Sequence, residues 1–173
     1  MARKLTRKEM REQLYRMLFQ LEFHKDAELD EQLALFMDDL QEIREADRIE
    51  LADKFHGVAA HVEELDSMIN DKSTGWKVGR LPKADLTVLR LAVYEIMFDE
   101  NVPDNVAVNE AVELAKAFSS DSAPAFINGI LGSCRCTRKE QYGCRDAVAV
   151  SKRYARFHRS TSISKICLLE IIC

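Results

Sequence analysis

The 173-residue sequence predicts an all-α fold, and two observations lead to that prediction. Apolar residues recur three and four positions apart in successive segments, which is the spacing of a buried helix face. The chain has only six glycines and three prolines, too few for a turn-rich all-β protein. Because 47% of the residues are apolar, the chain can bury a core. We expect six or seven helices and no strand.

The first helix is predicted to begin at Thr6. Thr6 and Glu9 stand three residues apart, the spacing of a capping box, and Leu5 and Met10 are placed to form a hydrophobic staple. One buried face follows at helical spacing, made of Met10, Leu14, Met17, Leu18 and Leu21.

Two further helices follow a break at residues 25–27. The first of them covers about residues 28–40. The second is the most regular element of the chain and runs as one helix over about residues 51–69, with Gly57 as its only weak point.

The next helix, introduced by Leu81-Pro82, has the broadest apolar surface and is therefore expected to be the most buried. Residues 101–104 form a turn, and another helix covers about residues 107–118. A short last helix begins after Ser122, which can act as its cap, with Pro124 in the first turn.

Charge is distributed unevenly along the chain. Residues 1–16 carry six basic and two acidic side chains. Residues 17–133 carry ten basic and 24 acidic side chains, and residues 134–173 carry nine basic and three acidic side chains. An acidic body with a basic start favours a partner with a localised anionic surface. No apolar run reaches the roughly 18 residues that span a bilayer. We expect a cytoplasmic protein without a membrane segment.

All five cysteines lie after residue 133, where the composition changes abruptly. We therefore predict two parts: a helical domain over residues 1–133 and an atypical basic, cysteine-rich tail over residues 134–173. The tail is either a disordered extension or a stretch translated out of the ancestral frame. Cys134, Cys136, Cys144 and His158 lack the paired Cys-x-x-Cys spacing of a zinc module, so no metal site is expected.

Catalytic motifs are missing from the sequence. It has no glycine-rich phosphate loop and no His-Glu-x-x-His pair, and no serine or cysteine of the body has a neighbouring base. We expect neither catalytic residues nor a cofactor, which leaves a binding protein. A basic start and several aromatic side chains suit contact with phosphates and unpaired bases, although a charged first helix is more often simply a solvated surface.

Four stretches in order resemble the NusB family of bacterial transcription antitermination factors. They are residues 86–95, Val102-Pro103, residues 106–116 with an Asn-Glu-Ala block, and residues 124–131 with a Phe-x-Asn-Gly block. The resemblance covers about residues 3–132. It implies an all-helical bundle of about seven helices in two packed sub-bundles.

The resemblance also implies a function. Family members pair with ribosomal protein S10 (NusE) and bind the boxA element of ribosomal RNA leader transcripts. With other Nus factors they support read-through by RNA polymerase, and some members form homodimers. Short single-stranded RNA suits recognition by phosphate contacts and base stacking.

By position, the resemblance implies a role for individual residues. The RNA-binding candidates are Arg3, Lys4, Arg7, Lys8, Arg11, Phe126 and, more weakly, Phe19, which packing inside the bundle explains equally well. The candidates for contact with S10 are Arg90, Tyr94 and Glu95, for which internal pairing is an equal alternative. Asn109 and Asn128 are expected to be structural, bonding backbone at helix junctions.

Two other functions stay open. One is a helical module that binds S10 without RNA specificity. The other is an RNA-modifying enzyme, since some RNA cytosine methyltransferases begin with such a domain. Residues 134–173 are too few for a methyltransferase sheet, which disfavours the enzyme.

The loop over residues 119–123 departs from the family pattern. It lacks the glycine common in the family, which puts the affinity for the partner in doubt.

Overall fold

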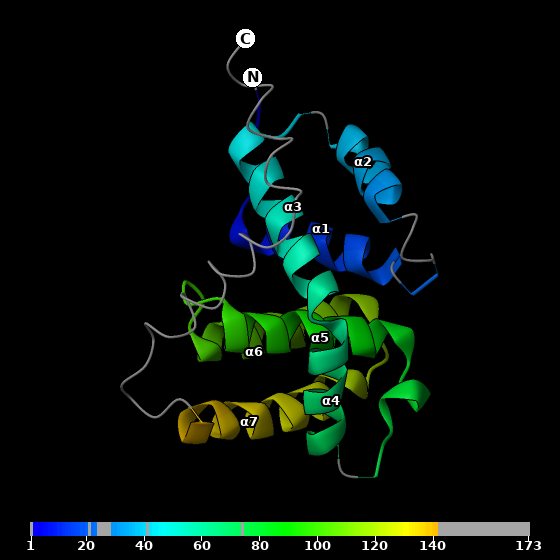
Figure 1. Ribbon diagram of the computed structural model, residues 1–173, viewed down its shortest axis with the longest axis vertical. Coiled ribbons are helices and arrows are strands. Elements are labelled where there is room, and N and C mark those ends of the chain that lie inside the picture. The colour runs from blue at the N-terminus through cyan, green and yellow to red at the C-terminus, as the bar shows by residue number, and fades with distance from the viewer. Residues whose placement is uncertain (1, 21, 24–28, 41, 74, 142–173) are drawn as a thin grey trace. The chain divides into compact units, whose positions relative to one another are not determined.

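The computed structural model describes residues 2–20, 22–23, 29–40, 42–73 and 75–141, with side chains up to residue 134 except at positions 29 and 30. These residues form seven α-helices (Figure 1). The helices are α1 (Arg7–Gln20), α2 (Leu29–Asp39), α3 (Glu45–Ala60), α4 (Val62–Lys72), α5 (Lys83–Phe98), α6 (Asp104–Phe118) and α7 (Ala123–Gln141). A 3₁₀ turn, η2 (Val78–Arg80), precedes α5. The predicted all-α class is confirmed.

Within the described residues, the one pairing of extended segments is an isolated parallel bridge between Arg3 and Ile43. Figure 1 shows α1, α2 and α3 gathered around one part of the domain and α4 to α7 around the other. The predicted break at residues 25–27 lies outside the described residues.

Helix α5 is the centre of the domain, as its broad apolar surface predicts. It packs against α1, α3, α4 and α6. Val88, Leu89, Val93 and Ile96 are fully buried. Because α5 touches helices on several sides, any polar side chain it carries must find a partner among them.

The predicted helix over residues 51–69 is wrong as a single element. It begins earlier, at Glu45, and is divided at His61 into α3 and α4. The Nδ1–H of His61 donates to the Gly57 carbonyl at 2.7 Å, while the His61 backbone N–H donates to Val58. The side chain thus takes the carbonyl that a regular helix would give to the backbone, and this interrupts the helix.

Gly57, the weak point of the predicted helix, has a packing reason. Glycine lets the ring of Tyr94 on α5 lie directly against the α3 backbone. A Cβ at position 57 would overlap the Tyr94 hydroxyl and stand 2.7 Å from the ring carbon that bears it. Glycine at position 57 therefore allows close contact between α3 and α5, although its helix propensity is low.

The last helix is longer than expected. Helix α7 continues through Gly132 and Ser133, where the composition changes, and ends at Gln141. Cys134 is buried in the core, so the packed part of α7 extends at least one residue beyond residue 133. Residue 133 as the limit of the domain stays a prediction.

Replacing Gly57 with Ala should lower the free energy of unfolding. Overpacking against Tyr94 costs about 1–3 kcal/mol, and the better helix propensity of alanine returns about 1 kcal/mol. Gly129→Ala on α7 is the matched control, because a Cβ there meets no atom within 4 Å. Urea unfolding followed by circular dichroism should show a loss for Gly57→Ala and a small gain for Gly129→Ala. Equal midpoints for the two variants would contradict the packing reason.

Candidate nucleic-acid interface

The basic segment before α1 is fastened to the start of α3 by backbone hydrogen bonds. The Arg3 N–H donates to the Glu42 carbonyl at 2.6 Å, and the Arg44 N–H donates to the Arg3 carbonyl at 3.1 Å. The buried Leu5 N–H donates to Asp47 at 2.9 Å. The basic side chains of this segment therefore project from backbone that is held in a fixed position.

The predicted capping box at the start of α1 is confirmed. The Thr6 N–H donates to the Glu9 carboxylate at 2.8 Å, and the Glu9 N–H donates to the Thr6 hydroxyl at 3.2 Å. Arg3 joins the same carboxylate at 2.7 Å. These bonds satisfy the open N–H groups at the helix start and place Arg7 in its first turn.

Four of the predicted RNA-binding residues reach solvent around this helix start. Arg3, Lys4, Arg7 and Lys8 are all exposed. Lys8 has one contact at the limit of an ion pair, 4.0 Å from Glu12. Lys4 and Arg7 have no ion-pair partner among the described side chains. The structure thus leaves four cations exposed at and just before the start of α1, and we call these four residues the basic start.

Arg11, which the resemblance also gives as an RNA-binding candidate, is buried and does not belong to that surface. Its side chain is 7% exposed, and its Nε donates to both oxygens of Glu95 on α5, at 2.9 and 3.1 Å. Its Nη1 lies 3.5 Å from Glu110 on α6. The guanidinium points inward because two carboxylates from neighbouring helices offer it partners there.

The carboxylate of Glu95 depends on this arginine. Glu95 is 2% exposed, and burial raises its pKa above the ordinary value, while Arg11 acts in the opposite direction. A buried charge without a partner is costly, so each member of the pair holds the other in place. Arg11 and Glu95 therefore fix the position of α1 against α5.

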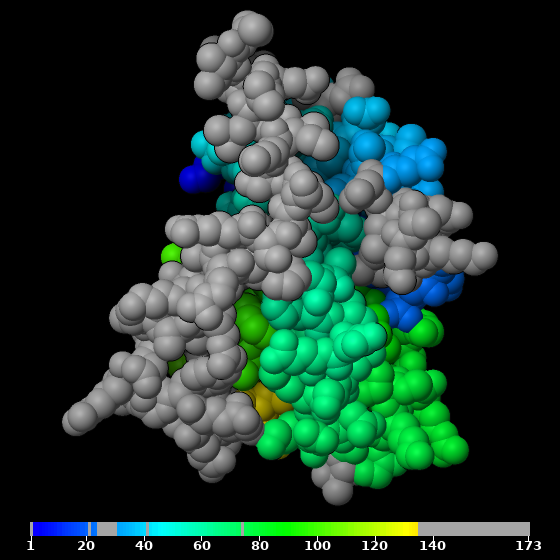
Figure 2. Space-filling view, in the orientation of Figure 1, coloured from blue at the N-terminus to red at the C-terminus, as the bar shows by residue number. Residues whose placement is uncertain are grey.

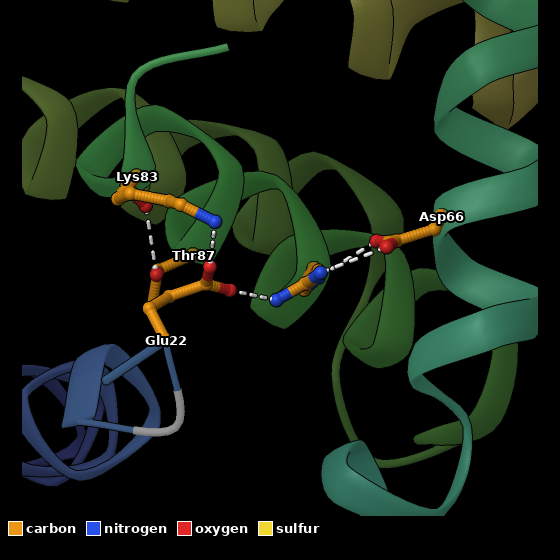
Figure 3. Close-up of polar contacts among 5 residues, drawn as sticks. Glu22, Asp66, Lys83 and Thr87 are labelled. Carbon is orange, nitrogen blue, oxygen red and sulfur yellow. Dashed lines mark hydrogen bonds and ion pairs between the residues drawn. The ribbon is translucent and has the colours of Figure 1, made fainter. Parts of the chain in front are cut away.

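The side chain of Arg90, which is predicted to contact S10, belongs to a second network of internal ion pairs (Figure 3). It donates to both oxygens of Asp66 on α4, each at 2.7 Å, and to Glu22 just after α1. Lys83, at the start of α5, pairs with the other oxygen of Glu22. This network ties α1, α4 and α5 together.

Tyr94, the remaining candidate for S10, is buried at 6% exposure. Its ring lies under Gly57 and 5.4 Å from the ring of Phe98, with His61 at 6.0 Å. The three S10 candidates are thus all placed in internal contacts. Of the two roles open at the sequence level, the structure shows internal pairing, and contact with S10 stays a prediction.

The two predicted aromatic residues lie in different places. Phe19 is half-buried on α1, with its ring 6.0 Å from Tyr15 and 5.2 Å from the exposed Phe23. Phe126 is half-buried near the start of α7, and its ring meets the edge of Trp76 at 6.2 Å. Trp76 lies in the loop after α4, at the far end of α3–α4 from the N-terminal segment (Figure 1). Phe19 and Phe126 therefore have different aromatic neighbours.

A groove between α6 and α7 contains residues to which the sequence assigned another role. It has a volume of about 500 Å³ and is lined by Asn109, Glu110, Val112, Glu113, Lys116, Pro124, Ala125 and Asn128. Asn109 and Asn128 are exposed, and neither side chain bonds to backbone among the described residues, contrary to the expectation that they do so at helix junctions. The exposure of Asn109 could have been predicted from helical spacing. Asn109 stands two residues from the buried Ala107 and Ala111, so its side chain faces away from the core.

The groove adjoins the basic start. The pKa of Glu113 lies below its ordinary value because Lys116 donates a hydrogen bond to it and, more weakly, because Lys8 lies nearby. Arg11 connects the same region to the interior through Glu110. The exposed surface thus runs from the start of α1 onto α6.

Metal binding finds no support in the part of the chain that the structure describes, where no three potential ligands gather. Burial raises the pKa of the Cys134 thiol to about 11, so this cysteine is a neutral core residue. Cys144 and His158 lie outside the described residues, and so does the side chain of Cys136. Among the helices described, none is long and apolar enough to cross a membrane.

The chain is similar to proteins of one family along most of its length. A model described as "NusB family" matches residues 8–135. The transcription antitermination protein NusB of Agathobacter rectalis is 46% identical over 127 residues, which are 73% of this chain and 97% of the relative. That of Clostridium novyi is 41% identical over 130 residues, which are 75% and 97% of the two chains.

Solved structures agree with the sequence comparison. The chain matches Thermotoga maritima NusB with a TM-score of 0.71 and 30% identity, over 78% of this chain and 93% of that one. It matches a chain in a crystal structure of antitermination factors NusB and NusE with double-stranded RNA with a TM-score of 0.67. That match covers 76% of this chain and 96% of the other at 20% identity, so it supports the fold alone.

Arg11→Met should destabilise the domain by about 3 kcal/mol, because it leaves the carboxylate of Glu95 buried without its main partner. Arg11→Lys keeps the charge but loses the two-bond contact, and we expect a smaller loss. Urea unfolding at neutral pH measures both. A variant as stable as the wild type would show that the pair does not hold α1 in place.

Stability at acid pH should depend on Asp47. Hydrogen bonds from Arg44 and from the Leu5 N–H hold the pKa of Asp47 below its ordinary value. A depressed carboxyl pKa stabilises the fold above the unfolded-state pKa of about 3.9, and this is lost as pH falls through the folded-state pKa. The urea midpoint should therefore fall less below about pH 4 in Asp47→Asn than in the wild type. Parallel curves would contradict this role.

Proposed function

The chain belongs to the NusB family of transcription antitermination factors, and from that premise we propose that it binds the boxA element of ribosomal RNA leader transcripts together with ribosomal protein S10 (NusE). In this role it works in the cytoplasm with other Nus factors and supports read-through by RNA polymerase. The family is not enzymatic, and the chain acts by binding.

The observation that carries the proposal is the basic start. Arg3, Lys4, Arg7 and Lys8 stand together in solvent on a chain whose body is strongly acidic. Their backbone is anchored to α3 through Leu5, and the capping box fixes the start of α1, so little ordering is needed when RNA binds. Exposed cations on a rigid support suit phosphate contacts, which dominate the affinity for nucleic acids.

We assign the remaining candidates different roles in this function. Phe19 and Phe126 each keep part of their ring accessible and are proposed to stack on unpaired bases. Arg11, Arg90, Tyr94 and Glu95 are proposed to act as positioning residues, because each one is engaged by neighbouring helices. They hold the surfaces that face RNA and S10.

The proposed functional domain is residues 1–133. The family match ends at residue 135, close to the change in composition, which supports this limit. The tail over residues 134–173 is proposed to lie outside the function, and self-association of the domain stays a prediction.

The central experiment is fluorescence anisotropy of a labelled boxA RNA, titrated with and without S10, beside a scrambled RNA of the same length. We expect tighter binding to boxA than to the scrambled RNA, and tighter still with S10. Equal affinity for the two RNAs, with S10 still bound, would instead identify a protein-binding helical module without RNA specificity.

Replacing Arg3, Lys4, Arg7 and Lys8 with Gln should weaken RNA binding and flatten its salt dependence. Each lost phosphate contact lowers the slope of log K against log salt by about 0.7 for single strands. Lys83→Gln is the control, since Lys83 is exposed but already paired with Glu22. Binding to S10 should be unchanged. A slope unaltered by the fourfold replacement would remove the basic start from the RNA-binding surface.

A further inference from the structure

We propose that Trp76, with Lys77 and Arg80, forms a second RNA-binding site, at which an unpaired base stacks on the indole ring. This inference rests on the proposed function and extends it to a surface that the basic start does not reach. The site consists of the loop after α4 and of η2.

Trp76 is exposed in a way that packing does not explain. Its relative exposure is 56%, among the largest of the apolar residues that the structure describes. The ring meets Phe126 at an interplanar angle of 70°, an edge-to-face contact that orients the indole without covering it. A large ring held in one orientation and open to solvent is suited to receive a second flat ring.

The loop backbone holds this ring in place. The Trp76 N–H donates to the Ser73 carbonyl at 3.1 Å, and the buried Ser73 hydroxyl donates to the Trp76 carbonyl at 2.6 Å. Gly75 between them has φ +84°, a left-handed conformation that favours glycine. The indole is therefore positioned before any partner arrives, which lowers the entropy cost of stacking.

Two cations stand directly after the ring. Lys77 and Arg80 are exposed, and among the described side chains neither has an ion-pair partner. The Arg80 N–H donates to the Lys77 carbonyl at 2.8 Å, so η2 fixes their spacing. An aromatic platform beside unpaired cations is the combination that binds single-stranded nucleic acid.

This surface is separate from the basic start. Figure 1 places the loop beyond the far end of α4, whereas the residues before α1 pair with the start of α3. In Figure 2 the segment after α4 belongs to the green atoms in the lower part of the visible face. The open indole ring and the two cations together favour RNA over a protein partner, because an unpaired base can stack on the ring while the phosphates neutralise both cations.

Position 76 can be observed directly, because Trp76 is the single tryptophan of the chain. The full chain labelled with 5-fluorotryptophan gives one ¹⁹F resonance from this ring, and unlabelled S10 adds none. The probe is a single-stranded boxA RNA extended by several nucleotides on each side, added in the presence of S10. We expect the ¹⁹F resonance to shift on RNA addition and not on addition of S10 alone.

Variants test the same site by affinity. Trp76→Leu should weaken binding of the extended RNA by about fivefold or more, whereas Trp76→Phe keeps a ring and should lose less. Lys77→Gln with Arg80→Gln should lower the salt slope by about 1.4. Leu35→Ala, at a residue of similar exposure on α2, is the control. Circular dichroism verifies that each variant is folded.

The outcomes separate this inference from the proposed function. Anisotropy showing RNA binding, with an unmoved ¹⁹F resonance and full affinity of Trp76→Leu, would overturn the second site and leave the proposed function intact. A resonance that moves with S10 alone would make the surface a protein interface and overturn the inference. Absence of RNA binding in the wild type would overturn both.

Discussion

The domain depends most on the buried pair between Arg11 on α1 and Glu95 on α5. Two charges are removed from water, and each is tolerated only because the other is present. The pair joins residues 84 positions apart, and Glu110 brings α6 to the same guanidinium. The first helix is thereby held against the central one, so the exposed cations that precede Arg11 have a fixed direction relative to the core.

The far end of α1 is held to α5 in a similar way. Glu22 lies between Lys83 and Arg90, and Arg90 continues to Asp66 on α4 (Figure 3). Both ends of α1 are thus attached to the same central helix by charged groups, while apolar side chains pack between them. Helix α5 serves as the rigid reference for the surfaces formed by α1, α4 and α6. The polar side chains of α5 hold the neighbouring helices in position.

Much of the fold could be predicted from local pattern, and the misses involve side-chain contacts that the spacing of apolar residues does not reveal. The capping box at Thr6 and the central helix follow from spacings of a few residues, and both are confirmed. The break at His61 was missed because it arises from a side chain bonding to a backbone carbonyl, which periodicity does not reveal. The sequence does not reveal that Arg11 points inward, because an arginine within a basic run resembles its neighbours until its partner is known. The exposed cations could be predicted from the sequence. The exposure and fixed orientation of Trp76 could not, because they depend on the geometry of its loop.

The contact between Gly57 and Tyr94 couples the substitutions that two distant positions can accept. While Tyr94 is present, any side chain at position 57 meets its ring, so glycine fits there best despite its poor helix propensity. If position 94 first acquired a smaller residue, alanine at position 57 would become acceptable and would fill part of the space. The order of substitution then decides which intermediate folds. Related chains are expected to vary at these two positions together rather than independently, and the tyrosine carries this constraint from α5 into α3.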